Sequence, residues 1–121
     1  MIKLLLIALG GGLGASARFL INESMRSYYF FMLPSGIIFV NFLGCFLIGI
    51  MMAQITDLKS NLYFFIVVGF LGSFTTMSAF SQQTIEMLYN GKEINALIYI
   101  LISVGSCLLG TILAYSFFKT T

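Results

Sequence analysis

Four long apolar stretches constrain the fold of this chain more than any other feature of its sequence. They lie at about residues 2–22, 34–54, 61–89 and 94–118, and the segments between them are short. A helix needs roughly 20 apolar residues to cross the hydrocarbon core of a bilayer, so each stretch is long enough for one span. Of the 121 residues, 60% are hydrophobic and 8% are charged. The sequence therefore predicts an all-α integral membrane protein, with residues 1–121 forming a single four-span membrane domain.

The first stretch also has features of a secretory signal. Lys3 near its start is followed by an apolar run and by the small residues Ala15, Ser16 and Ala17, a pattern at which signal peptides are cleaved. Three further spans follow, however, and small residues four apart, such as Gly10 and Gly14, let helices pack closely in lipid. We therefore predict a first membrane span rather than a cleaved signal.

Basic residues are divided almost evenly between the two sides of the predicted membrane domain. One side carries Lys3, Lys59 and Lys119, and the other carries Arg26, Lys92 and, if it lies near the end of its span, Arg18. Because Lys and Arg near span ends set orientation, this balance gives almost no orientation signal. We predict insertion in both orientations and an antiparallel, dual-topology dimer, and the alternative is that a neighbouring protein fixes one orientation. No nucleic-acid partner is expected.

The third stretch contains a run that is unusual for a continuous span. Residues 69–81 combine glycines with clustered serines and threonines, which weaken a helix by adding backbone freedom and offering competing local hydrogen bonds. We predict that this third helix is broken near its middle, between Gly72 and Thr76. Carbonyl oxygens freed there need partners, and two antiparallel copies crossing at this point would surround one hard monovalent cation with them.

The positions of the acids argue against two classes of function. Every acid lies in a connector or near the end of a span, namely Glu23, Asp57, Glu86 and Glu93. A proton-coupled exporter needs an acid at mid-depth. The chain also has no His and no paired acids, which disfavours an enzyme. Cys45 and Cys107 lie in separate spans without such groups nearby, so we predict small packed side chains there and no metal site.

Neutral donors remain as candidates for an anion path. Asn41 is the only amide near the middle of the second stretch, where it either makes an interhelical hydrogen bond or lines such a path. Residues with i, i+3, i+4 and i+7 spacing share one face of the third stretch, and these are Met77, Phe80, Ser81 and Thr84. Because the edge of a phenyl ring is positive, Phe80 beside hydroxyl groups could accept a small anion. An ordinary packing face is the alternative.

Three blocks of residues resemble the Fluc (CrcB) fluoride channels, small four-span proteins that export fluoride from microbes. The blocks are the glycine-rich run 10–14 with Ala15 and Arg18, then Pro34 and Gly36 leading to Asn41, Gly44 and Gly49, and the run 69–81. The resemblance implies a passive, fluoride-selective channel of the inner (plasma) membrane, built in the lipid bilayer as an antiparallel dual-topology dimer. It also implies a structural Na⁺ where the two broken helices cross.

Residue roles follow from the same resemblance, position by position. The backbone carbonyls of Gly72 and Thr75 would hold the Na⁺. Asn41 and Phe80 would line the fluoride path, with Met77 and the hydroxyl residues Ser81 and Thr84 beside them and with Ser103, Ser106 and Thr111 as further hydroxyl candidates. Arg18 would stand at the vestibule and attract the anion, and a snorkelling side chain paired with Glu23 or a lipid phosphate is the alternative.

Three positions depart from the family pattern. Met77 replaces the first of two phenylalanines, Ile37 replaces a threonine, and Gln83 stands where relatives often have a glutamate. A thioether fills space but lacks the positive edge of a ring. The alternative function is therefore a non-conducting or partly impaired membrane subunit that pairs with a non-identical homologue.

Overall fold

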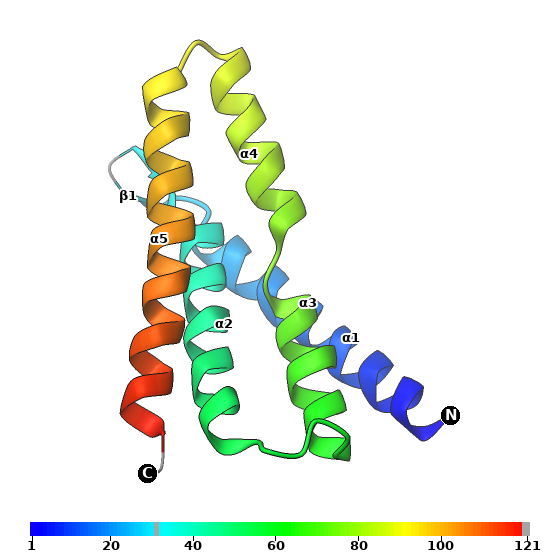
Figure 1. Ribbon diagram of the computed structural model, residues 1–121. Coiled ribbons are helices and arrows are strands. Elements are labelled where there is room, and N and C mark those ends of the chain that lie inside the picture. Colours follow the sequence, from blue (N-terminus) through cyan, green and yellow to red (C-terminus); the bar gives the residue numbers. More distant parts are fainter. Residues whose placement is uncertain (31, 120–121) are drawn as a thin grey trace.

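Four membrane-length helical units make up most of the structure, a computed structural model that describes residues 1–30 and 32–119 (Figure 1). The continuous helices are α1 (Ile2–Ser24), α2 (Ser35–Gln54) and α5 (Glu93–Phe118). The third unit is made of the π-helical segment η1 (Tyr63–Leu71), the single turn α3 (Gly72–Phe74) and α4 (Met77–Tyr89). All four units are long and apolar enough to cross a membrane, so the predicted four-span α-helical membrane fold is confirmed.

A short β-hairpin, which the sequence did not lead us to expect, joins α1 to α2. Its strands β1 (Tyr29–Phe30) and β2 (Leu33–Pro34) pair antiparallel, with Tyr29 opposite Pro34. Pro34 both ends the hairpin and occupies the N-cap of α2, with φ at −65°. A proline costs no helical hydrogen bond at this boundary, because the first N–H groups of a helix have no partner within it. The second span therefore begins directly after the hairpin.

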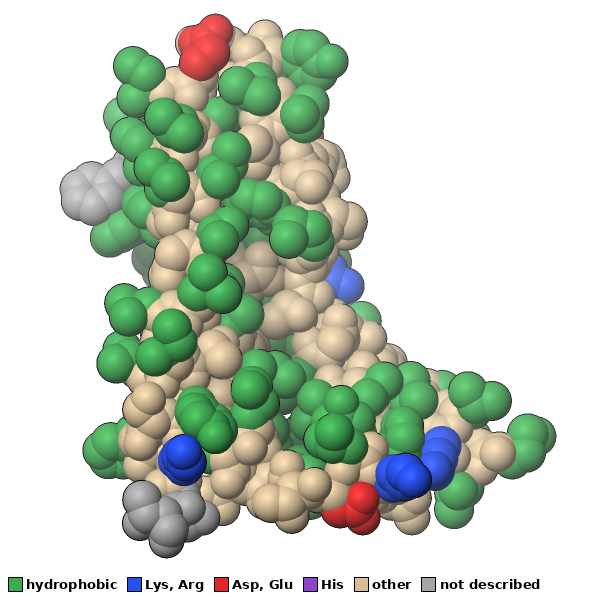
Figure 2. Space-filling model, viewed as in Figure 1, with side chains coloured by type: hydrophobic (Ala, Val, Ile, Leu, Met, Phe, Trp, Pro, Cys, Tyr) green, Lys and Arg blue, Asp and Glu red, His purple; other side chains and the backbone are tan. Residues whose placement is uncertain are grey.

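The helices pack as two pairs with α4 set against one of them. α2 lies against α5, whereas α1 lies against η1 and α3, and α4 packs on α5. In Figure 1, α1 slants away from α5, so the molecule opens into two arms. Figure 2 shows an open concave region between the arm that contains α1 and the arm formed by α4 and α5. The break in the third unit lies where these two arms meet.

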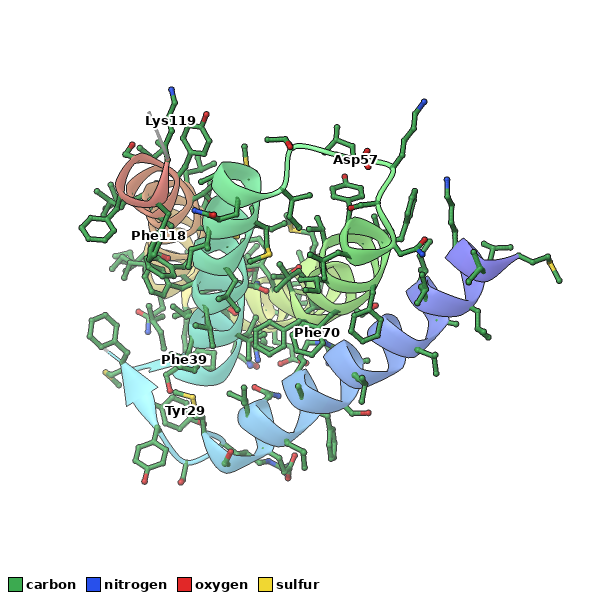
Figure 3. The ribbon with its side chains drawn as sticks, turned by 90° about the horizontal axis from the view of Figure 1, so that it is seen from below. Tyr29, Phe39, Asp57, Phe70, Phe118 and Lys119 are labelled. Carbon is green, nitrogen blue, oxygen red and sulfur yellow. The ribbon has the colours of Figure 1, made fainter. Side chains whose placement is uncertain are left out.

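Apolar side chains cover most of the outer surface. Leu13, Leu101 and Leu109 are 57%, 64% and 56% exposed, and the charged side chains visible in Figure 2 lie mostly towards the extremities. Asp57 and Lys119 lie at the same end of the molecule (Figure 3). This distribution suits lipid, where exposed apolar side chains meet hydrocarbon and a buried charge is costly.

Glycines allow α1 and η1 to approach closely. A Cβ atom on Gly10 would lie 2.2 Å from the carbonyl oxygen of Phe65, and one on Gly14 would lie 2.1 Å from that of Phe70. Figure 3 places Phe70 on the side of its helix that faces α1. Both glycines are buried, so the predicted packing surface on the first span is confirmed.

Replacing Gly14 by alanine is expected to force α1 away from η1, because the new Cβ would meet a backbone oxygen that no side-chain rotation can move. The cost should be about 1 to 3 kcal/mol of stability. We would measure the temperature at which the detergent-solubilised protein loses its monodisperse size-exclusion peak. Gly12→Ala is the matched control, since a Cβ there would meet nothing within 4 Å. Equal losses in both variants would contradict the proposed contact.

Candidate functional site

The break in the third span lies at two adjacent threonines. Thr75 has φ −79° and ψ 154°, and Thr76 has φ −146° and ψ 119°, so both are extended. Gly72 is helical, with φ −61° and ψ −32°. The predicted break in the middle of the third helix is therefore confirmed, but it is narrower than expected, because the helix continues through Gly72 to Phe74 before the chain extends.

Asn41 of α2 satisfies both backbone groups of Thr76 at the break. Its Nδ2 donates to the carbonyl oxygen of Thr76 at 3.0 Å, and its Oδ1 accepts from the amide of Thr76 at 2.8 Å. An unpaired buried peptide group would cost about 1 to 3 kcal/mol. From the sequence, Asn41 was expected either to make an interhelical hydrogen bond or to line an anion path. The structure contains the interhelical hydrogen bond. The second N–H of Nδ2 is not used in this pair.

Further polar contacts fix the two ends of the break. The Thr76 hydroxyl accepts from the amide of Ala79 at 3.2 Å and so caps the N-terminus of α4. Arg18 reaches across from α1, and its Nε donates to the carbonyl oxygen of Ser73 at 3.1 Å. Glu23 instead pairs with Arg26 at 3.0 Å. Arg18 is thus half-buried against the broken helix.

Some carbonyl oxygens at the break keep free lone pairs. Thr75 directs both its amide and its hydroxyl to the carbonyl oxygen of Leu71, at 3.2 and 3.1 Å. Within the described part of the chain, the carbonyl oxygens of Gly72, Phe74 and Thr75 accept no hydrogen bond. The C-terminal end of a helix is electronegative, so these oxygens form a region suited to a hard cation such as Na⁺.

Gly44 allows α2 to press against this region. A Cβ atom at Gly44 would lie 2.2 Å from Cγ2 of Thr75 and 3.3 Å from the ring of Phe74. Phe74 is buried and stacks on Phe70, with ring centroids 5.7 Å apart. The chain therefore extends at Thr75 while its side chain is packed against the glycine surface of α2.

A cavity of about 260 Å³ adjoins the break. α2 contributes Asn41, α4 contributes Met77 and Phe80, and α5 contributes Ser103. Three predicted path residues, Asn41, Met77 and Phe80, are therefore brought together. Ser81 is exposed and is not part of this cavity wall.

The hydroxyl groups near the cavity differ in whether they are available. Thr84 is buried outside the cavity wall, and its hydroxyl donates to the carbonyl oxygen of Phe80 at 2.8 Å. Ser106 donates to the carbonyl oxygen of Ser103 at 3.3 Å. The hydroxyl of Ser103 itself is buried and has no hydrogen-bond partner among the described residues. Ser103 is therefore the hydroxyl best placed to serve a bound anion.

Tyr99 is a site residue that the sequence analysis missed. It is fully buried, and its ring stacks on Phe80 with centroids 5.3 Å apart. Its hydroxyl donates to Oε1 of Gln83. The side chain therefore covers one face of the Phe80 ring and fixes its position. In a chain with 13 Phe and 6 Tyr, nothing in the spacing distinguishes this tyrosine.

A second, more polar hollow of about 450 Å³ lies between the hairpin, the end of α1 and α4. Gln83, Glu86 and Arg26 contribute to its wall. Gln83 also bonds to Tyr99, which in turn stacks on Phe80 at the first cavity. A continuous chain of side-chain contacts therefore connects the polar hollow with the cavity at the break.

The chain has clear relatives over nearly its whole length. Residues 5–115 match the family described as "CrcB-like protein, Camphor Resistance (CrcB)". A protein of Shewanella halifaxensis named "Fluoride-specific ion channel FluC" is 36% identical over 110 residues, which are 89% of each chain. A protein of the same name from Francisella tularensis (strain SCHU S4) is 37% identical over 119 residues, 93% of this chain and 91% of the relative.

Removing the Asn41 amide should loosen the break selectively. In Asn41→Leu, the amide and carbonyl of Thr76 lose their partners, so we expect hydrogen exchange around residues 74–80 to accelerate about tenfold or more. Exchange would be followed by mass spectrometry, with α1 peptides as the internal reference. Gln82→Leu is the control, because it removes only an exposed bond to Glu86. Equal acceleration in α1 and at the break would refute a local role for Asn41.

Proposed function

This chain belongs to the CrcB family, and on that basis we propose that it is a passive, fluoride-selective channel in which the cavity at the break forms part of the anion path. The observation that carries the proposal is the match of almost the whole chain to proteins named as fluoride-specific channels. The four spans make it a multi-pass membrane protein. Fluoride would cross down its own gradient, since none of the residues lining the cavity is a carboxylate that could couple transport to protons.

The side chains at the cavity suit a small anion that must shed its water. The Ser103 hydroxyl has no partner among the described residues, and Asn41 has one N–H beyond its bond to Thr76. Phe80 has one face covered by Tyr99, and the positive edge of its ring is the part that attracts an anion. Several weak donors replace hydration while still letting the ion leave, which a buried cation would hinder.

We further propose that two copies assemble in opposite orientations around a structural Na⁺. The nearly balanced basic residues support insertion in both orientations. The free carbonyl oxygens of Gly72 and Thr75 support cation binding at the break. Oxygen ligands suit Na⁺, which would neutralise the electronegative helix ends where two broken helices meet. Arg18, fixed beside Ser73, would supply positive charge at the approach to the path.

The alternative is a partly impaired subunit that works beside a non-identical homologue. Met77 lines the cavity but is 69% exposed, so a partner subunit could reach it. Ile37 is 2% exposed and is not part of the cavity wall. The absence of a threonine hydroxyl at position 37 therefore affects this cavity less than the absence of a phenyl ring at position 77.

Fluoride efflux from liposomes that contain only this chain tests the proposal. Wild-type protein should release fluoride and not chloride, and Phe80→Ile should reduce the fluoride rate about tenfold or more while the dimer persists, because an aliphatic side chain has no positive ring edge. Phe117→Ile is the control, at an 83% exposed position near the end of α5. Silence of the wild-type chain would favour the heteromeric alternative, and chloride leak would contradict selectivity.

Removal of Na⁺ provides a separate test of the cation site. After prolonged dialysis into N-methylglucamine medium, fluoride efflux should fall, since the carbonyl oxygens of Gly72 and Thr75 would lose the ion that offsets their partial charge. Restoring Na⁺ should restore the rate. Full activity after dialysis, with residual sodium below the protein concentration, would rule out an essential Na⁺.

A further inference from the structure

Three sulfur-bearing side chains from three different helices line the cavity at the break. They are Cys45 of α2, Met77 of α4 and Cys107 of α5. From the sequence we predicted small packed side chains at both cysteines and no metal site. The structure instead brings them together at a shared cavity, and both are only half-buried.

The two cysteines are held at the same level of the α2–α5 contact. The hydroxyl of Thr111 lies 2.8 Å from the carbonyl oxygen of Cys45 and 3.1 Å from that of Cys107, so one side chain ties the two backbones together. Both cysteines line the same cavity as Met77, one from each of the two helices that Thr111 ties together. Gly49 allows this approach, since a Cβ there would lie 2.5 Å from the carbonyl oxygen of Thr111.

We propose that Cys45, Cys107 and Met77 form a binding site for a soft monovalent metal ion of the Cu⁺ and Ag⁺ class in the wall of the cavity. Thiolates and thioethers are the ligands that such ions prefer. Two thiolates from facing helices give the two-coordinate arrangement these ions accept, and the flexible side chain of Met77 supplies a third, weaker donor. Nothing in this assignment requires the cavity to conduct fluoride.

Binding changes the charge of the cavity wall. Each thiol gives up its proton when its sulfur bonds to the metal, so two neutral thiols and one monovalent cation yield a bis-thiolate complex of charge −1 and two released protons. Asn41 and Phe80 line the same cavity. If the cavity is the fluoride path, as proposed above, a negative complex beside these two residues will repel the anion and block its flow.

The site can be tested with Ag⁺ added to the purified, full-length protein in chloride-free nitrate medium. Bound silver would be measured by equilibrium dialysis and elemental analysis, and free thiols by maleimide labelling. Wild-type protein should bind one Ag⁺ per chain with both thiols protected. Cys45→Ser and Cys107→Ser should each weaken binding about tenfold or more, because each removes a primary ligand. Met77→Leu should weaken it by a smaller factor, whereas Met87→Leu, outside the cavity wall, should leave it unchanged.

Two outcomes of the silver titration would overturn the site. One is the absence of tight silver binding to wild-type protein. The other is two independent silver ions per chain, with each single-cysteine variant keeping one of them at undiminished affinity. Size-exclusion profiles would confirm that each variant is folded, and thiol protection in the wild-type protein tests the site even if a variant fails to fold.

A second measurement separates this proposal from the proposed channel function. Ag⁺ should stop fluoride efflux from wild-type liposomes, and the double variant Cys45→Ser/Cys107→Ser should resist that block when its rate is compared with its own silver-free rate. Block of equal depth in the double variant would show that silver does not act through these thiols. If the wild-type chain releases no fluoride, the proposed function fails, and the silver stoichiometry still tests the metal site.

Discussion

The paired hydrogen bonds between Asn41 and Thr76 are the interaction on which the rest of the site depends. A helix can be interrupted inside a membrane only where its freed backbone groups find partners in the protein, in water or in an ion. Asn41 supplies one donor and one acceptor from a neighbouring span, and both serve the backbone of a single residue, Thr76. Once Thr76 is held in this way, its hydroxyl can cap α4, and Phe80 and Met77 are directed into one cavity with Asn41.

The polarity of the break follows from this arrangement. Asn41 bonds only to Thr76, so the carbonyl oxygens of Gly72, Phe74 and Thr75 at the end of α3 accept no hydrogen bond within the described part of the chain. The N-terminus of α4, in contrast, is capped by the Thr76 hydroxyl. The electronegative end therefore suits a cation, and the cavity a few residues further along offers neutral donors to an anion. Arg18 moderates the negative end by bonding to Ser73. The cation site and the anion path that we propose would thus lie side by side without a formal charge in the cavity wall.

Much of the fold could be predicted from the sequence, because membrane spans are marked by length and composition and the break is marked by residues that weaken a helix. Its width was misjudged, since Gly72 permits unwinding but does not require it, and packing of Thr75 against Gly44 decides where the chain extends. Site membership was harder to predict. The spacing placed Ser81 and Thr84 on one face with Phe80. The rotation of α4 about its axis where it packs on α5 determines which of these three side chains lines the cavity, and only Phe80 does so. Tyr99 and the cysteine pair depend on contacts between different spans, which the periodicity within one span does not encode.

The π-helical form of η1 makes the length of that segment as important as its composition. Its hydrogen bonds connect residues five apart, so the nine residues of η1 wind less tightly than an α-helix. The direction in which Thr76 leaves the helix therefore depends on how many residues η1 contains and on how many of its hydrogen bonds span five residues rather than four. We conclude that η1 works as a spacer, because its length and its winding together set the angle at which the chain reaches the break.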